Sequence, residues 1–300
     1  MIQKGAPVRR LGLTASRNRP SHFTSRFTVQ GTLGQGEFSQ VDKVEDKQDG
    51  VLYAVKRAKK PYTGPRDRLR KLEEVDILRY LGKDGGHLNI VAFFDAWEEA
   101  GHLYIQTELC PCVDFSSFLQ HFSNMGGSMD EARLWKVLRE LSEGLGFIHD
   151  MQVLHLDLKP ANIFITEIAT LKIGDFGLAT RWPRNADAMT SSLLNHTPKS
   201  LEREGDREYI APEILRGGFG KPADVFSLGL VMLEAAGDVI LPDNGEPWHK
   251  IRNDDFSDVD LSAFSISLVN VIKSLLRSNP EARPNLNELR QHPVLQAVGR

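Results

Sequence analysis

The sequence predicts an α+β protein with two lobes, a small β-rich lobe followed by a mainly helical one. Short runs of alternating apolar and polar residues, separated by glycine-containing turns, extend from Phe27 to Cys110 and are typical of strands. Beyond Cys110, apolar residues recur at helical spacing over longer stretches. The 300 residues are 41% hydrophobic and 26% charged. This length and composition suit one large domain or two small lobes, and they exclude a disordered, collagen-like or coiled-coil chain.

The β-rich lobe is expected to contain five strands and one helix. The turns Gly34–Gly36 and Asp49-Gly50 separate the first three runs, and Ala100-Gly101 separates the last two. Between these groups, apolar residues near 3.6-residue spacing predict a helix over Arg66–Leu81, which ends at Gly82. The expected strands cover residues 27–29, 40–44, 52–55, 90–97 and 103–109.

Four helices are expected in the second lobe. The longest opens at a capping box, Ser128-Met-Asp-Glu131, and runs to His149. Thr180–Glu208 is polar and without periodicity, so we expect a long loop, a feature that is usually functional or disordered. The other three helices cover residues 223–236, 262–276 and 285–291. The expected domains are 27–110 for the first lobe and 111–297 for the second.

The first 26 residues differ in composition from the rest. They carry six basic side chains and no acidic one, so the remainder carries about −9 of charge beneath the overall −3. The segment is also rich in Ser, Thr, Pro and Gly, and residues 1–26 are therefore expected to form a basic, disordered tail. Nucleic-acid binding has only this tail in its favour, and no nucleic-acid partner is expected.

Expected absences of a transmembrane segment and of a signal peptide bear on the cellular compartment. No window reaches about 18 consecutive apolar residues, so no transmembrane segment is expected, and Met1–Arg10 lacks the apolar part of a signal peptide. The two cysteines, Cys110 and Cys112, are too few to cross-link this fold or complete a four-ligand zinc site. The sequence therefore favours a reducing compartment, the cytosol or the nucleus.

A glycine-rich turn lies between the first two expected strands, in Leu33-Gly-Gln-Gly-Glu-Phe-Ser-Gln-Val41. Glycines allow backbone amides to approach phosphate oxygens closely. The turn is a weak indication alone, because glycine-rich hairpins are common. It is not a dinucleotide-binding fingerprint, since a strand rather than a helix follows.

Lys56 lies within the apolar strand Tyr53–Arg57, where an unpaired lysine would be costly to bury. Glu74, on the expected helix, is a suitable partner, and Glu73 is the neighbouring alternative. The other interpretation is an edge-strand lysine whose ammonium group points to water.

Three further motifs follow in order: His155-Leu-Asp157-Leu-Lys159-Pro-Ala-Asn162, Asp175-Phe-Gly177 and Ala211-Pro-Glu213. Together with Lys56 and Glu74, they have the order and approximate separations of the protein-kinase signature. The chain from Phe27 to Leu295 therefore resembles a eukaryotic protein kinase, which implies the bilobal kinase fold. Arg283 is expected to pair with Glu213.

The resemblance implies phosphoryl transfer from ATP, a reaction that depends on positioning and charge neutralisation. Lys56, oriented by Glu74, is expected to hold the α- and β-phosphates. Asp157 is expected to accept or orient the proton of the substrate hydroxyl, and Lys159 to neutralise the γ-phosphate.

The metal and nucleotide sites follow from the same resemblance. Asn162 and Asp175 are the expected ligands of Mg²⁺, which prefers oxygen ligands. Thr107 is the expected gatekeeper and Glu108–Cys110 the hinge that bonds adenine, so Cys110 and Cys112 are expected to be packing residues. The expected nucleotide-binding residues are Leu33, Gly34, Gln35, Gly36, Glu37, Phe38, Ser39, Gln40, Val41, Ala54, Lys56, Thr107, Glu108 and Cys110.

Three positions depart from the commonest kinase pattern. Ser39 replaces the third glycine of the loop. Leu156 replaces the arginine that normally pairs with a phosphorylated residue of the activation segment, so activation by phosphorylation there is not expected. Asp206 stands where serine/threonine kinases place a threonine, and it is expected to pair with Lys159.

These departures indicate which family of protein kinases the chain resembles. Glu204-Gly-Asp206, the run His155–Phe164 and Gln106–Cys110 together look like the Wee/Myt family of mitotic inhibitory kinases. Lys60–Val75 resembles the membrane-associated Tyr/Thr-specific branch most closely, although no membrane segment of that branch is found in these 300 residues.

The resemblance implies a dual-specificity kinase. Family members phosphorylate a tyrosine, and in the Myt branch also the adjacent threonine, in the glycine-rich loop of the mitotic cyclin-dependent kinase, which delays mitosis. A cyclin-dependent kinase with its cyclin is the expected substrate and partner. A monomer is expected, in the nucleus or alternatively in the cytoplasm.

Two other functions remain open. A kinase for a translation initiation factor has a similar catalytic loop, but it typically carries a long insert where only Glu98–His102 stands here. A pseudokinase scaffold would lack one of the catalytic residues, and none is missing.

Three surface features have two interpretations each. Residues 56–71 contain eight Lys or Arg and one Asp, which indicates a solvated face or a site that attracts an acidic partner. The Thr190–Ser200 insert is a surface loop, or an autophosphorylation or partner site. Arg9–Leu13 resembles a short cyclin-docking pattern that also arises by chance.

Overall fold

The computed structural model describes residues 9–10, 21–127, 129–183 and 205–298, with Arg9 and Arg10 described by their backbone alone. The chain divides into two compact units, Met1–His87 with Val91–Pro111 and Leu88–Ile90 with Cys112–Arg300. The first contains the expected β-sheet and the second the expected helices, so the α+β prediction is confirmed.

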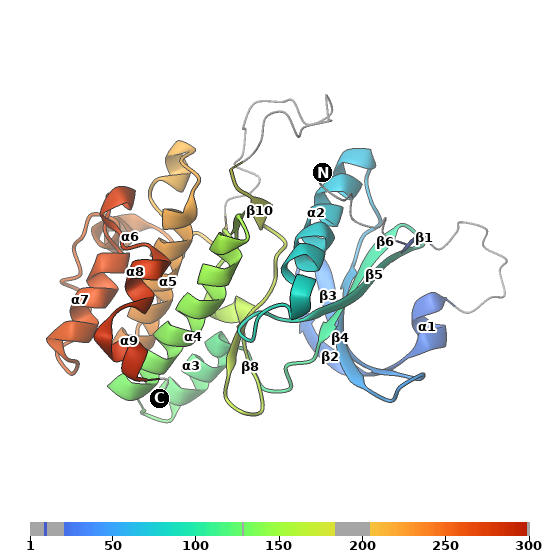
Figure 1. Ribbon diagram of the computed structural model, residues 1–300, viewed down its shortest axis with the longest axis horizontal. Coiled ribbons are helices and arrows are strands. Elements are labelled where there is room, and N and C mark those ends of the chain that lie inside the picture. The colour runs from blue at the N-terminus through green and yellow to red at the C-terminus, as the bar shows by residue number, and fades with distance from the viewer. Residues whose placement is uncertain (1–8, 11–20, 128, 184–204, 299–300) are drawn as a thin grey trace. The chain divides into compact units, whose positions relative to one another are not determined.

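A six-stranded sheet forms the first unit, in the order β1-β5-β6-β4-β3-β2 (Figure 1). The five expected strands pair antiparallel, and β1 adds a short parallel edge to β5. At the β5–β6 turn, Ala100 and Gly101 have φ values of 50° and 78°, which suits a tight hairpin. The strands are β1 (Arg9–Arg10), β2 (Phe27–Gln35), β3 (Ser39–Asp46), β4 (Leu52–Ala58), β5 (Phe93–Glu99) and β6 (His102–Glu108).

Helix α2 (Pro65–Leu81) confirms the helix expected in this unit and contacts strand β5. Pro65 occupies the first helical position, where a missing amide costs nothing, and Gly82 ends the helix. Val75 and Ile77 are buried, so one face of α2 belongs to the core of the unit. A short 3-10 helix, η1 (Lys83–Gly85), follows.

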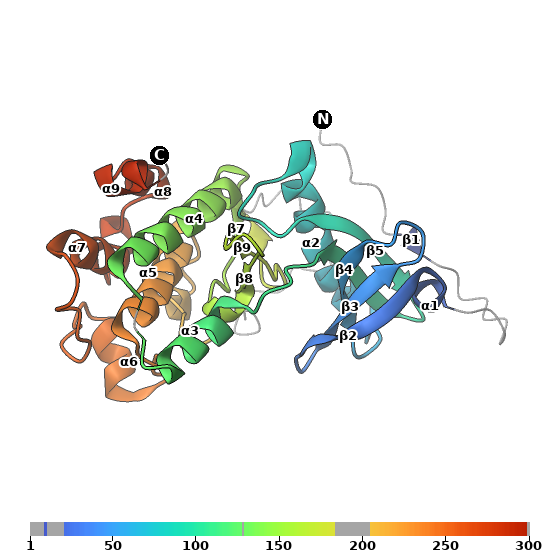
Figure 2. The same ribbon diagram turned by 90° about the horizontal axis from the view of Figure 1, so that it is seen from below.

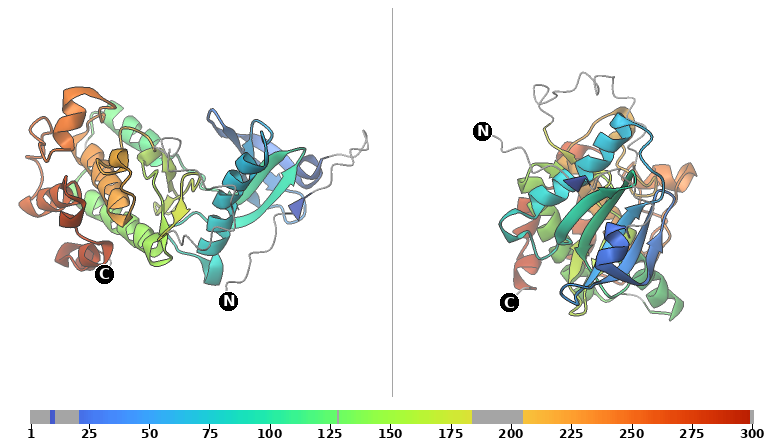
Figure 3. Two further views of the ribbon diagram at one scale, coloured as in Figure 1. Left: turned by 90° about the horizontal axis from the view of Figure 1, so that it is seen from above. Right: turned by 90° about the vertical axis from the view of Figure 1, so that its right-hand side faces the viewer.

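Helix α1 (His22–Arg26) shows that the prediction of a disordered tail over residues 1–26 is wrong for its last part. The side chain of Phe23 is 6% exposed and packs with Phe27, Trp97 and Tyr104. Figure 3 shows α1, in blue, beside the sheet. Strand β1 is a second ordered piece of the same segment. Residues 1–8 and 11–20 lie outside the described residues.

Polar contacts at both ends hold α1 in place. The carboxylate of Glu99 accepts hydrogen bonds from the amides of His22, at 2.6 Å, and Phe23, at 3.2 Å. The guanidinium of Arg26 pairs with the buried carboxylate of Asp46 at 2.8 Å. The basic composition of the segment predicts solvation, but it gives no weight to the aromatic pair at positions 23 and 27, which the sheet buries.

The second unit is mainly helical, and α4 (Glu131–Asp150) and α5 (Lys221–Gly237) lie side by side in it (Figure 2). Large apolar side chains of both helices, such as Leu141 and Phe226, are fully buried. The other helices are α3 (Phe115–Asn124), α6 (Gly245–Ile251), α7 (Ile266–Leu275), α8 (Leu286–Arg290), α9 (Pro293–Ala297), η2 (Pro160–Asn162), η5 (Ile214–Arg216) and η6 (Pro280–Ala282).

Two helix starts differ from the prediction. Helix α4 begins at Glu131 with Asp130 as its N-cap, whose carboxylate accepts from the amide of Arg133 at 2.8 Å, so the predicted capping box is wrong. Helix α7 begins after the cap Ser265 rather than at residue 262. Helices α3, α6 and α9 were not predicted; each is short, with ten residues or fewer.

Two small antiparallel pairs, β7 (Val153–Leu154) with β10 (Thr180–Arg181) and β8 (Ile163–Ile165) with β9 (Leu171–Ile173), complete the second unit. A parallel bridge between Ile90 and Ile173 explains why Leu88–Ile90 joins this unit rather than the sheet. Within the described ranges, no helix combines the length and apolar character needed to cross a membrane.

We expect Phe23→Ala to lower the free energy of unfolding of the first unit by about 3 kcal/mol, because it removes a buried aromatic side chain from the cluster. Denaturant unfolding monitored by Trp fluorescence measures the change, since Trp97 lies in that cluster.

Phe94→Ala is the matched control, because Phe94 is 53% exposed and the same atoms are removed there. We expect its effect to be below about 1 kcal/mol. Equal losses from both variants would show that α1 adds nothing to the stability of the sheet.

Candidate active site

One face of the first unit's sheet gathers several predicted nucleotide-binding residues. Ala54 lies directly opposite Thr107 in the β4–β6 register, and Lys56 lies opposite Val41 in the β3–β4 register. Residues directly opposite each other, or two apart on one strand, share a face of a sheet. Val41, Ala54, Lys56 and Thr107 therefore share one face.

The glycine-rich hairpin joins β2 to β3 at the edge of that sheet. Gly34 pairs with Val41 and Gln35 with Gln40, and the amide of Gly36 bonds to the carbonyl of Ser39 at 3.0 Å. The predicted residues Leu33, Glu37 and Phe38 are exposed around the turn.

The chain itself does not require glycine at positions 34 and 36. Neither residue has a positive φ, a Cβ atom at Gly34 would meet no atom within 4 Å, and one at Gly36 would meet only the carbonyl of Ser39, at 3.9 Å. The space that these Cβ atoms would fill suits the close approach of phosphate oxygens to backbone amides. The hairpin therefore fits a nucleotide.

Lys56 is paired as expected. Its ammonium lies 2.8 Å from the Glu74 carboxylate, with the side chains 25% and 12% exposed. The pairing with Glu74 rather than with the alternative Glu73 is confirmed, and the interpretation of Lys56 as a lysine directed to water is wrong. The pair is only partly buried, and a lysine ammonium carries three N–H donors.

The predicted hinge follows β6. The hydroxyl of Thr107 donates to the carbonyl of Glu108 at 3.3 Å, and the carboxylate of Glu108 accepts from the amide of Ala92 at 2.6 Å. The side chain of Glu108 thus secures the start of β5. Cys110 is partly buried, Cys112 is exposed, and both are free thiols.

In the second unit, the catalytic loop begins where β7 ends, at His155. The ring of His155 is fully buried; its Nδ1 accepts from the amide of Asp157 at 3.3 Å, so Nε2 carries the proton that bonds the carbonyl of Gly174 at 3.0 Å. His155 thereby ties the loop that carries Asp157 to the segment that carries Asp175.

Asp224 of α5 anchors the same loop. Its fully buried carboxylate accepts from the amides of His155, at 2.9 Å, and Leu156, at 2.7 Å, and from the His149 ring at 2.8 Å. Burial alone would raise the pKa of Asp224, but the His149 ring and these backbone donors outweigh it and hold the pKa below its ordinary value. Asp224 therefore stays ionised as the acceptor of all three bonds.

The predicted catalytic residues lie close together in this unit. The amide nitrogen of Asn162 donates to the carbonyl of Asp157, at 2.8 Å, and to its carboxylate, at 2.9 Å. The other carboxylate oxygen of Asp157 accepts from the amide of Asp206 at 3.2 Å. Both oxygens of Asp157 are thus oriented by neighbouring donors.

The expected pair of Lys159 and Asp206 is confirmed. The ammonium of Lys159 lies 3.3 Å from the carboxylate of Asp206 and 3.4 Å from that of Asp157. Burial alone would lower the pKa of Lys159, but the two carboxylates raise it above its ordinary value. Lys159 therefore remains a cation beside Asp157.

Asn162 and Asp175 fit a magnesium site that is completed by a ligand. Because the side-chain amide nitrogen of Asn162 is directed to Asp157, its amide oxygen remains as the metal-binding atom. Asp175 is exposed after β9 and has a positive φ of 51°. The described residues contain no group of three His, Cys, Asp or Glu side chains that could enclose a metal. This arrangement suits Mg²⁺, which usually combines one or two protein ligands with phosphate oxygens and water.

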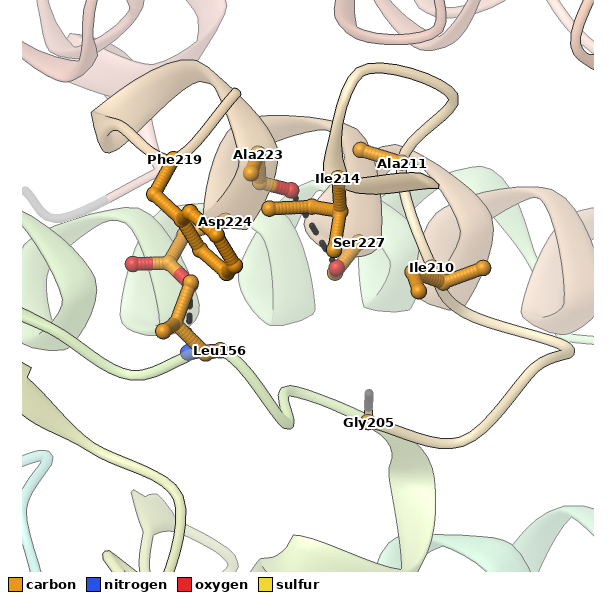
Figure 4. A pocket seen from close by; sticks show the side chains of 9 residues that line it. All are labelled: Leu156, Gly205, Ile210, Ala211, Ile214, Phe219, Ala223, Asp224 and Ser227. Carbon is orange, nitrogen blue, oxygen red and sulfur yellow. Dashed lines mark hydrogen bonds between the residues drawn. The ribbon is translucent and has the colours of Figure 1, made fainter. Parts of the chain in front are cut away.

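Leu156 lies beside a small cavity whose walls are mostly apolar but include Asp224 and Ser227. It lines a cavity of about 10 Å³ with Ile210, Ile214 and Phe219, and Figure 4 shows its backbone bonded to Asp224. This volume accommodates about one water molecule. Among the residues that the structure describes, no basic side chain lines this cavity.

Close packing fixes the segment that follows the undescribed residues. A Cβ atom at Gly205 would lie 2.6 Å from the carbonyl oxygen of Leu156, so only glycine fits there. Further along, the Arg283 guanidinium binds both carboxylate oxygens of Glu213, at 2.6 and 2.9 Å, which confirms that pair. Glu204 and the Thr190–Ser200 insert lie outside the described residues.

Sequence reasoning missed three contributors to this site: Asp224, Arg252 and the pair Tyr209–Glu234. Asp224 could have been suspected as a carboxylate within an apolar helix, since burial of a charge requires partners. Glu234 gives the same signal, because it lies in the same apolar helix, whereas Arg252 gives none, because its partners are backbone carbonyls.

Comparison with known proteins shows the family. Residues 27–295 match the protein kinase domain. Mitosis inhibitor protein kinase wee1 of Schizosaccharomyces pombe is 47% identical over 250 residues, 82% of this chain and 27% of the relative. A membrane-associated tyrosine- and threonine-specific cdc2-inhibitory kinase of Drosophila melanogaster is 39% identical over 277 residues, 92% of this chain and 48% of the relative. Mitosis inhibitor protein kinase SWE1 of Saccharomyces cerevisiae is 40% identical over 251 residues, 81% of this chain and 29% of the relative.

These matches confirm the resemblance to the Wee/Myt kinases. They include both branches, so the preference for the membrane-associated branch stays a prediction. The chain spans less than half the length of each of these relatives. A protein kinase domain implies a nucleotide and a divalent metal, and the residues described above fit both.

Glu234 of α5 gives the second unit a pH-dependent stability. Its carboxylate accepts from the Tyr209 hydroxyl at 2.5 Å. Burial, together with the nearby carboxylates of Glu208 and Asp206, raises its pKa from 4.5 to about 7, against the opposing effect of the Tyr209 bond. Between pH 4.5 and 7 the folded protein therefore holds a proton that the unfolded chain releases, and stability falls as pH rises through this window.

We expect Glu234→Gln to flatten this pH dependence, because the amide oxygen still accepts from Tyr209 but does not ionise. At pH 8 the variant should be more stable than the parent by on the order of 2 kcal/mol. Denaturant unfolding at pH 5, 6, 7 and 8 measures the difference. The exposed Glu281→Gln serves as control, and parallel profiles for Glu234→Gln and the parent would contradict the assignment.

Proposed function

Because the chain belongs to the protein kinase family, we propose that it transfers the γ-phosphoryl group of ATP to a tyrosine and the adjacent threonine of a mitotic cyclin-dependent kinase, and so delays mitosis. The observation that carries the catalytic part is Asp157, whose two oxygens are oriented by Asn162 and Asp206 beside the cationic Lys159.

In this proposal, Mg·ATP supplies the phosphoryl group and the substrate hydroxyl receives it. The residues expected to hold the nucleotide are the hairpin from Leu33 to Val41, the hinge and Lys56, which Glu74 keeps in place. Asn162 and Asp175 would hold Mg²⁺ through their oxygen atoms. All of these groups contribute by positioning and charge, as phosphoryl transfer requires.

Asp157 and Lys159 have separate tasks at the acceptor. Asp157 accepts the hydroxyl proton, and the donors from Asn162 and Asp206 orient its two carboxylate oxygens. Lys159 neutralises charge on the transferred group, and its raised pKa keeps it protonated. Asp206 adds a second carboxylate to the floor of the acceptor site, which distinguishes this site from one with the usual threonine.

The substrate is inferred from the relatives' names. One relative is a cdc2-inhibitory kinase specific for tyrosine and threonine, and others are mitosis inhibitors. We extend that role to this chain, with both residues of the target's glycine-rich loop as acceptors. We also propose that the chain acts as a monomer on a cyclin-dependent kinase bound to its cyclin, in the nucleus.

We expect Asp157→Asn to lower kcat by at least about 100-fold, because the amide cannot accept the proton, while ATP affinity changes less than about threefold. Steady-state kinetics and a nucleotide titration followed by thermal unfolding measure the two effects. Asp260→Asn, the same change at an exposed position whose oxygen accepts from the amide of Ser262, is the control. Full activity of Asp157→Asn would show that the proton acceptor is misassigned.

The substrate proposal is tested by incubating the full chain with a cyclin-dependent kinase–cyclin complex and labelled ATP, then mapping the modified residues by mass spectrometry. We expect label on the tyrosine and the adjacent threonine of the target's glycine-rich loop, and none with Asp157→Asn. Separate Tyr→Phe and Thr→Ala targets measure the preference between the two. Label confined to other positions would reject the substrate and leave kinase activity intact.

A further inference from the structure

Arg252, a buried side chain at the end of α6, makes the most hydrogen bonds to the backbone between Asp206 and the Ala211-Pro-Glu213 motif. We call residues 206–210 the substrate segment, because Asp206 touches both Asp157 and Lys159. The guanidinium of Arg252 donates to three carbonyls of this segment: Arg207 at 3.1 Å, Glu208 at 3.0 Å and Ile210 at 3.1 Å. A fourth bond, to the carbonyl of Trp248 at 3.2 Å, returns to α6.

Trp248 completes this anchor. Its indole nitrogen donates to the carbonyl of Arg207 at 2.9 Å, and its ring centroid lies 3.7 Å from the Arg252 guanidinium carbon. Such a short distance provides a strong cation–π interaction. Trp248 and Arg252 are 6% and 3% exposed.

The chemistry of the anchor is specific to arginine. In the described part of the chain, the contacts of Arg252 are four carbonyls and the rings of Trp248 and Phe226, with no carboxylate among them. A planar fork with five N–H donors can reach several carbonyls at once, whereas a lysine offers three donors around one point. Burial lowers the pKa of Arg252 to about 9, which leaves it charged at neutral pH.

The substrate segment is also connected to the catalytic residues. Asp206 donates its amide to Asp157 and pairs through its carboxylate with Lys159. The amide of Tyr209 bonds to the carbonyl of Asp206 at 2.9 Å, and Ser227 of α5 donates to the carbonyl of Tyr209 at 2.9 Å. A shift of the segment would therefore move the groups that orient the proton acceptor.

We propose that Arg252, supported by Trp248, is a positioning residue that holds the substrate segment in the place from which Asp206 contacts Asp157 and Lys159. The anchor on α6 supplies four donor bonds to this segment, three from Arg252 and one from Trp248. This inference rests on the proposed kinase activity and adds to it how the active arrangement is maintained.

Arg252→Lys tests the proposal, because it keeps the charge and removes the fork. We expect kcat toward the protein substrate to fall roughly tenfold or more, with the KM for ATP within about twofold of the parent, since no nucleotide-binding residue contacts Arg252. Arg133→Lys, the same change at a side chain that is 59% exposed, should match the parent. Equal activity of Arg252→Lys and the parent would overturn the proposal, as would a parallel loss of ATP affinity.

Trp248→Phe provides a second variant that keeps a smaller aromatic ring beside the guanidinium and removes the indole N–H that bonds to the carbonyl of Arg207. We expect a smaller fall in kcat in the same direction. A fall larger than that of Arg252→Lys would indicate that the tryptophan supports the fold rather than the anchor, and would overturn the assignment of Arg252 as the main contact.

Hydrogen–deuterium exchange gives a readout that does not depend on the substrate. In the full chain, Arg252→Lys should raise exchange in peptides covering residues 205–211 by roughly tenfold and leave α4 unchanged. Uniformly raised exchange would show a general loss of stability and overturn the proposal. If the parent transfers no phosphate to the cyclin-dependent kinase, the proposed substrate fails, but the exchange result still decides the role of Arg252.

Discussion

The buried carboxylate of Asp224 is the interaction on which the catalytic unit depends. Helix α5 carries it into the core, where donors from His149, His155 and Leu156 surround it. A buried carboxylate without such donors costs several kcal/mol, so the three bonds form together or the helices do not pack. The catalytic loop is thereby tied to α4 and α5, and Asp157 is positioned by the helical core rather than by the loop itself.

The hydrogen bonds of Asp224 also offset backbone strain in the catalytic loop. Leu156 has a φ of 62°, a conformation that costs a residue with a Cβ atom about 1–2 kcal/mol. The bond from its amide to Asp224 offsets that cost, and the resulting turn lets the amide of Asp157 bond to His155. Backbone strain and a buried charge, each unfavourable alone, are therefore combined to fix one catalytic side chain.

Patterns that are local in sequence allowed much of the fold and of the candidate active site to be predicted. Alternation and glycine turns predicted the antiparallel strands, and motif order predicted the pair Lys56–Glu74. The aspartate at a position where threonine is usual predicted the pair Lys159–Asp206. The rest depended on contacts that join distant residues. Phe23 is ordered because Trp97 and Tyr104 bury it, although its neighbours are basic. Arg252 binds carbonyls, which every residue carries, so no pattern of side chains could have revealed its partners.

The hydrogen bonds of Arg252 have a consequence for how such an enzyme can be controlled. A phosphate can be added and removed within seconds, but an arginine side chain is present from synthesis to degradation. A kinase whose substrate segment is held by Arg252 would lack an off state at that position. Its output would then follow the number of folded molecules and their access to the target, so synthesis, degradation and location would become the means of regulation.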